Sequence, residues 1–134
     1  MQFFNLCVIT SALFAALSVA QSVTGITGAN CNDYVISPRA INSAALAALR
    51  HLNAGTTVGR NNYPHRYNNF ESFTFNAGCN PPYYEFPVFR DHVYTGGSPG
   101  LDRVVVGSWD GTNIMYCGMC ELSTYIYTIC SILS

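Results

Sequence analysis

Five cysteines spread over residues 31–130 are the feature that most restricts which folds this chain can adopt. They are Cys31, Cys79, Cys117, Cys120 and Cys130. In a small secreted domain such cysteines indicate a disulfide framework that supports a modest hydrophobic core. The odd number leaves one thiol free or paired between molecules. A redox role for Cys117 and Cys120 is disfavoured because no βαβ pattern surrounds them, and a zinc role is disfavoured because no second cysteine pair or histidine pair completes four ligands.

The N-terminal stretch predicts secretion, the setting in which disulfides persist. Residues 6–17 form an apolar run of twelve residues, and Ser18-Val19-Ala20 follows as a small-residue cleavage site. A membrane anchor is the alternative interpretation, but a spanning helix needs about 20 apolar residues. We therefore expect residues 1–20 to be a signal peptide, and residues 21–134 to form one domain with no membrane association.

Charged residues are sparse, and this argues against non-specific nucleic-acid binding. The six basic residues are all arginine, and seven acidic residues give a net charge of −1. A general nucleic-acid binder usually carries a basic stripe, and none is present here. Any RNA binding must come from a formed site. We expect a monomer without a metal ion or other cofactor.

One amphipathic helix is predicted after residue 37. Ser37 is a favourable N-cap, Pro38 suits the first helical position and Gly55 suits the end. Between them, apolar residues recur at helical spacing, namely Ile41, Ala45, Ala48, Leu49 and Leu52. These residues predict a single apolar face that packs on a sheet.

The remainder of the chain is aromatic, β-branched and rich in turn residues. Residues 83–89, 103–106, 113–117 and 125–130 read as strands, and Asp110-Gly111 predicts a hairpin between two of them. One helix followed by successive strands predicts an α+β fold, in which the helix packs on an antiparallel sheet.

Three segments carry the residues suited to chemistry: 63–71, 81–88 and 96–105. Taken singly, His65, Glu85 and Arg103 each have an unremarkable surface or ion-pair interpretation. Together on adjacent strands, they would supply a base and charge stabilisation for one phosphodiester. Metal-free RNA cleavage needs a base for the 2′-hydroxyl, a cation for the phosphoryl oxygens and an acid for the departing 5′-oxygen.

With these segments in this order, the chain resembles the fungal guanyl-specific extracellular ribonucleases, of the ribonuclease T-one type. The resemblance implies the microbial ribonuclease fold, with Glu85 as general base and Arg103 as phosphate ligand. Tyr63 and His65 resemble the pair that contacts the phosphate, with His65 assisting the base. Tyr127 stands where the family has an aromatic residue beside the phosphate.

The same resemblance implies a guanine site and a disulfide scheme. Tyr67, Asn68, Asn69 and Phe70 resemble the segment that holds guanine by backbone contacts and stacking, and Glu71 resembles the carboxylate that accepts its N–H groups. Cys31 and Cys130 correspond to the family's terminal bridge. Cys79 is expected to pair with Cys117 or with Cys120.

One departure bears on catalysis. The family carries a second histidine as the leaving-group acid, and no histidine follows His92 in this chain. Alignment on Gly118 places Tyr116 at that position. A phenol with an ordinary pKa of about 10 donates weakly, and it is larger than an imidazole.

The leading hypothesis is a secreted protein that binds single-stranded, guanine-containing RNA with impaired or lost cleavage. Such a protein resembles the ribonuclease-like effectors that plant-pathogenic fungi deliver into host cells, which bind host RNA or host protein. One alternative is an active guanyl-preferring endoribonuclease that forms a 2′,3′-cyclic phosphate. The other is a protein-interaction scaffold with a relic site. A cleavage assay beside a nucleotide-binding assay separates the three.

Overall fold

The computed structural model describes residues 19–133, so residues 1–18 of the predicted signal peptide lie outside the described part of the chain. The predicted helix is present as α1, which spans Pro38–Ala54. Ser37 accepts a hydrogen bond from the backbone N–H of Ala40 and caps the first turn. Gly55 ends the helix in the left-handed conformation, with φ at 66°.

The main sheet contains the predicted strands and two that the sequence did not indicate. Its strands run in the order β1-β7-β6-β5-β4, and β8 pairs with the far part of β7. Their bounds are β1 Val23–Thr24, β4 His65–Tyr67, β5 Tyr83–Pro87, β6 Asp102–Gly107, β7 Ile114–Ser123 and β8 Ile126–Ile129. All pairs are antiparallel except β1 with β7.

A second, three-stranded sheet joins the two ends of the domain. It has the order β3-β2-β9, with bounds β2 Gly28–Asn30, β3 Val35–Ile36 and β9 Ser131–Leu133. The Cys31–Cys130 disulfide directly follows β2 and directly precedes β9. The bridge implied by the family resemblance therefore ties the ends of the domain together.

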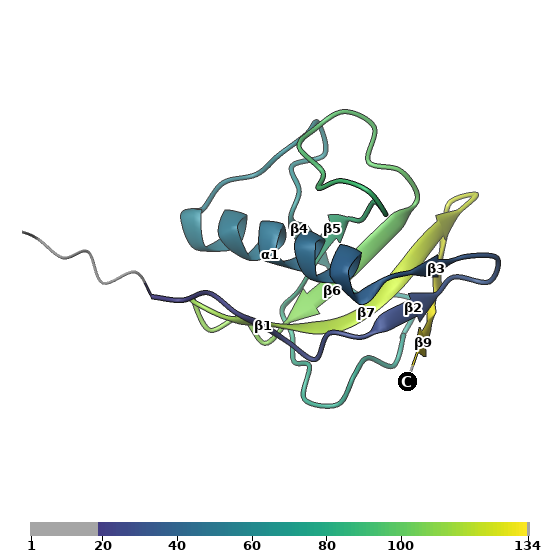
Figure 1. Cartoon of the computed structure of the whole chain (residues 1–134), viewed down its shortest axis with the longest axis horizontal. Helices are drawn as coiled ribbons and strands as arrows, with labels where there is room; N and C mark the ends of the chain where they lie inside the picture. The colour runs from purple at the N-terminus through teal and green to yellow at the C-terminus, as the bar shows by residue number, and fades with distance from the viewer. Residues whose placement is uncertain (1–18, 134) are drawn as a thin grey trace, which may run out of the picture.

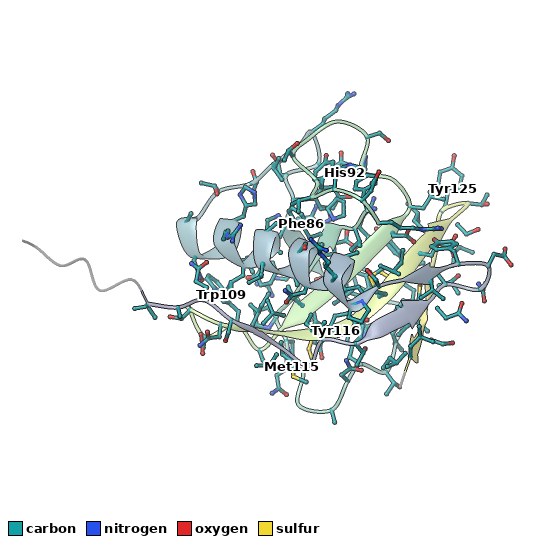
Figure 2. The ribbon with its side chains drawn as sticks, in the orientation of Figure 1. Phe86, His92, Trp109, Met115, Tyr116 and Tyr125 are labelled. Carbon is teal, nitrogen blue, oxygen red and sulfur yellow. A yellow bond between two sulfur atoms is a disulfide. The ribbon has the colours of Figure 1, made fainter. Side chains whose placement is uncertain are left out.

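The helix covers one face of the main sheet, as Figure 1 shows. The core on this side is formed by apolar residues of α1 together with Phe86, Val104, Val106 and Tyr116, all of them fully buried. The opposite face carries a smaller cluster around Tyr67, Val105, Cys117 and Cys120. The α+β prediction is confirmed: one helix packs on a largely antiparallel sheet.

A β-bulge between β6 and β7 controls which side chains reach each face. Val105 pairs with Gly118, but the next residue, Val106, pairs with Tyr116, so Cys117 is an extra residue in β7. Cys117 forms a disulfide with Cys79 on the side of the sheet away from the helix. Cys120 remains a free, buried thiol.

The strands extend beyond their predicted limits mainly in β7, which runs to Ser123. The loop expected at Asp110-Gly111 connects β6 to β7, and the Asp110 carboxylate accepts hydrogen bonds from the backbone N–H groups of Thr112 and Asn113. Within residues 19–133, no helix is both long enough and apolar enough to cross a membrane.

Candidate active site

Glu85 lies at the centre of the sheet face that the helix leaves open. Across the strands it has His65 of β4 on one side and Val105 of β6 on the other. Cross-strand partners point to the same face, so His65 and Glu85 meet there. Glu85 is only 4% exposed, and a buried carboxylate needs hydrogen-bond donors to remain charged.

The first such donor is His65. Its Nε2 contacts Glu85 Oε1, and its Nδ1 donates to the backbone carbonyl of Asn61 at 2.8 Å. The hydrogen bond to Glu85 is the main cause that raises the pKa of His65. Its ring also stacks on Tyr63, with centroids 4.5 Å apart. The contact with Glu85 therefore favours the protonated, positively charged form of the imidazole.

Arg103 supplies a second positive charge on the neighbouring strand β6. Its Nε donates to the Tyr63 hydroxyl at 3.1 Å, and Nη1 donates to the carbonyls of Pro99 and Gly100 at 3.0 and 2.9 Å. Gly100 has a φ of 62°, a left-handed conformation that suits glycine, and this turn lets the carbonyls of Pro99 and Gly100 both face the guanidinium. The hydrogen bonds found in residues 19–133 use Nε and Nη1 and leave Nη2 without a partner, and Arg103 is only 2% exposed.

Tyr127 approaches Glu85 from the other end of the sheet. Its hydroxyl donates to Glu85 Oε1 at 3.3 Å, and its ring packs edge-on against Tyr67 with centroids 5.8 Å apart. Burial is the largest cause that raises the pKa of this phenol, and the charge of Glu85 adds to it. The hydroxyl therefore remains protonated at neutral pH.

The second carboxylate oxygen of Glu85 completes the site. Oε2 is buried and has no hydrogen-bond partner among the described residues. An unpaired buried acceptor is costly, and a substrate hydroxyl would satisfy it. Oε2 is therefore the carboxylate oxygen that can take a proton, and His65 and Tyr127 both contact the other oxygen, Oε1.

The prediction that Tyr116 occupies this site is wrong. Tyr116 is fully buried in the core beneath α1, and burial there raises its pKa to about 12. Counting two residues back from Gly118 would reach the same face in a regular strand. The bulge at Cys117 instead sends Tyr116 to the opposite face. Tyr116 neither blocks the site nor donates a proton in it.

Cys120 is the site-facing residue that the sequence did not reveal. It is the direct partner of Arg103 across β6 and β7, and it packs in the cluster with Tyr67 and Tyr127. Its thiol is fully buried, and burial is the main cause that raises its pKa. The surroundings of Cys120 and Cys117 differ because of the pairing register of β7 with β6, including the bulge. No pattern in the sequence predicts that register, so the position of Cys120 beside Arg103 was not predicted.

The predicted guanine segment borders a cavity of about 500 Å³. The cavity is lined by residues 66–69, Ser72, Phe73 and residues 81–83. Asn69 has a φ of 54°, and its side chain bonds the backbone of Phe73 in both directions. Tyr67 donates to Glu71 at 2.8 Å. Phe70 is 87% exposed and available for stacking.

The other two histidines belong to different surroundings. His51 bonds Thr56 at the end of α1, and His92 bonds Asp91 on the surface. Among residues 19–133, no group of three or more His, Cys, Asp or Glu side chains is arranged to hold a metal ion.

The chain is similar to known fungal enzymes. Residues 25–126 match the family described as ribonuclease. Guanyl-specific ribonuclease Th1 of Trichoderma harzianum is 47% identical over 79 residues, which cover 58% of this chain and 74% of that protein. Extracellular guanyl-specific ribonuclease Fl1 of Gibberella baccata is 41% identical over 88 residues, covering 66% and 78%. The solved structure of a ribonuclease from Hericium erinaceus has a TM-score of 0.53 and 29% identity, and it covers 78% of this chain and 98% of its own.

Proposed function

Because the chain belongs to the fungal guanyl-specific ribonuclease family, we propose that it is a secreted protein that binds guanine in single-stranded RNA and cleaves the adjacent phosphodiester weakly. The product of that cleavage is a 2′,3′-cyclic phosphate. This combines recognition of the base by the segment around Glu71 with slow chemistry at Glu85.

The observation that carries the proposal is the unpartnered Oε2 of Glu85. The other carboxylate oxygen already accepts from His65 and Tyr127, whereas Oε2 is buried and has no hydrogen-bond partner among the described residues. A ribose 2′-hydroxyl that donates to Oε2 would lose its proton there as its oxygen attacks phosphorus. The positive charges of His65 and Arg103 would stabilise the phosphoryl oxygens.

Weak turnover follows from the residue that faces Arg103 across strands β6 and β7. An imidazolium would deliver a proton efficiently to a leaving 5′-oxygen near neutral pH, and the β7 residue at that place is Cys120. A buried thiol with a raised pKa is a poor donor. A positioned general acid is worth about 10²–10⁴-fold in rate, so cleavage should fall short of a complete site by up to that factor.

Guanine preference rests on the carboxylate of Glu71. An ionised carboxylate only accepts hydrogen bonds, and the Watson–Crick edge of guanine presents two N–H groups to it. Tyr67 holds one carboxylate oxygen by donating to it at 2.8 Å. Adenine offers no matching pair of ring and amino hydrogens at that edge.

Secretion is supported by the leader sequence, by the two disulfides and by the relative from Gibberella baccata that is named extracellular. The finer proposal is that the protein acts as an effector delivered into host cells. Weak turnover supports this, because binding of RNA or of a host protein then becomes the useful activity.

Calorimetry with guanosine and adenosine monophosphates tests the function. We expect the guanosine nucleotide to bind at least about tenfold more tightly, as a hydrogen bond to a charged group allows. Glu71→Ala should abolish the difference, whereas Glu121→Ala, which removes a carboxylate on β7, should preserve it. Equal affinities in the parent, or no binding of either nucleotide, would favour the scaffold alternative.

A further inference from the structure

A leaving 5′-oxygen must receive a proton, and Tyr116, Cys120 and Tyr127 are the residues that could replace the family's second histidine as its source. Tyr116 is excluded because its phenol lies in the core on the other face of the sheet. Cys120 is fully buried, and burial raises the pKa of its thiol, which makes it a poor proton donor. Tyr127 is only partly buried, and its hydroxyl already reaches the reacting carboxylate.

The position of Tyr127 relative to His65 also suits a donor. His65 reaches Glu85 from β4, at one end of the sheet, whereas Tyr127 reaches it from β8, beyond β6 and β7. Arg103 lies on β6 between them. A phosphate held by Arg103 would therefore lie within reach of Glu85, His65 and the Tyr127 hydroxyl, which itself contacts the Glu85 carboxylate at 3.3 Å, so that a base and an acid could act on one phosphodiester.

The geometry points to Tyr127 as the catalytic acid of this chain, which donates its phenolic proton to the departing 5′-oxygen. This inference rests on the proposed function and names the group that completes it. A ring without a hydroxyl at position 127 would supply only contact area. The hydroxyl adds an O–H group that, alone among those of residues 19–133, is hydrogen-bonded to Glu85 Oε1.

The protons balance within the Glu85–Tyr127 pair. Glu85 Oε2 takes the 2′-hydroxyl proton, the 2′-oxygen bonds to phosphorus, and the bond from phosphorus to the 5′-oxygen breaks. The 5′-oxygen takes the proton of Tyr127 and leaves as an alcohol. The phenolate then recovers a proton from Glu85, because Tyr127 Oη and Glu85 Oε1 are 3.3 Å apart. Both groups return to their starting states.

If Tyr127 is the acid, the 2′,3′-cyclic phosphate should accumulate as the product. Hydrolysis of the cyclic phosphate would require Tyr127 to act as a base on water, and this needs a phenolate in the resting site. Burial and the charge of Glu85 both oppose the phenolate, since they raise the pKa of Tyr127. The reaction should therefore stop at the 2′,3′-cyclic phosphate.

The test compares Tyr127→Phe with the parent on two guanosine substrates. Guanylyl-3′,5′-cytidine has a poor leaving group that needs a proton, whereas the p-nitrophenyl ester of guanosine 3′-phosphate has a leaving group that needs none. We expect Tyr127→Phe to lower kcat on the dinucleotide about tenfold or more, at the low end of a general-acid effect because the phenol is weak. On the nitrophenyl ester, kcat should remain close to that of the parent.

Tyr125→Phe is the matched control, because Tyr125 is 97% exposed at the hairpin tip and should not affect either rate. Equal loss on both substrates would mean that Tyr127 only positions Glu85, and no loss on the dinucleotide would exclude a role in the reaction. A parent that binds guanosine monophosphate but never cleaves the dinucleotide would overturn the acid role and leave guanine recognition intact. Failure of nucleotide binding would instead count against the proposed function.

Discussion

Cys120 lies directly opposite Arg103 across strands β6 and β7, with both side chains on the open face of the sheet. If Arg103 binds the phosphate as proposed, its neighbour on β7 occupies the place from which an efficient acid would act. A thiol there is smaller than an imidazole and is fully buried. We therefore propose that position 120 is the one at which the site is incomplete.

Cys120→His should raise cleavage of guanylyl-3′,5′-cytidine above that of the parent by at least about tenfold, part of the gain expected from a general acid. The gain should fade as pH rises through about 6.5, where an unperturbed imidazolium loses its proton. Initial rates between pH 5 and pH 8 would show this. Overpacking of the site by the larger ring would cost about 1–3 kcal/mol of stability, so unfolding must be measured in parallel. A folded variant without added activity would contradict the assignment.

Tyr116→Phe should leave both nucleotide binding and cleavage unchanged, because Tyr116 lies on the opposite face from Glu85. Tyr116→His should likewise add no activity and should lower the free energy of unfolding by about 1–3 kcal/mol, since it places an imidazole in an apolar core. Rates and thermal unfolding of the two variants, beside Cys120→His, would test this. A gain in cleavage from Tyr116→His would instead show that Tyr116 occupies the position of the family's second histidine, as alignment on Gly118 predicted.

Tyr116 and Cys120 lie on opposite faces of β7, and the sequence alone did not predict which of them faces Glu85. Helix α1 was predicted to the residue, because Ser37, Pro38 and Gly55 are local signals that act within a few residues. The sequence also predicted that His65, Glu85 and Arg103 lie on adjacent strands, and the structure brings His65 into contact with Glu85, with Arg103 on the next strand. The bulge at Cys117 depends on how β7 pairs with β6, and a shift of one residue exchanges the faces of a strand.

The short strands were missed for a related reason. β1 pairs with β7 in parallel, and β2 pairs with β9 from the other end of the chain. Strands of two or three residues carry no periodicity of their own, so their existence depends on distant partners. The choice between Cys117 and Cys120 as partner of Cys79 stayed open for the same reason, because it is decided by the bulge.

Removal of the terminal bridge tests how the two sheets depend on it. The Cys31–Cys130 disulfide spans 99 residues of sequence, so the double change Cys31→Ser and Cys130→Ser should lower the free energy of unfolding by about 2–5 kcal/mol. Denaturant unfolding would measure this. Cys120→Ala, which removes the free thiol and leaves both bridges, serves as the control and should have the smaller effect. Equal midpoints for the parent and the double variant would show that β2 and β9 hold without the bridge.

The His65–Glu85 pair makes stability depend on pH in a defined direction. The hydrogen bond to Glu85 raises the pKa of His65 in the folded protein, whereas the unfolded chain should titrate near 6.5. The stabilisation is therefore fully present below about pH 6.5 and is lost as pH rises through the higher folded-state pKa. Titration by NMR should place the His65 transition above 6.5 in the parent and shift it down in Glu85→Gln, while the His51 signal, from a ring bonded to Thr56, stays the same in both. An identical His65 transition in the two proteins would show that the pair does not form in solution.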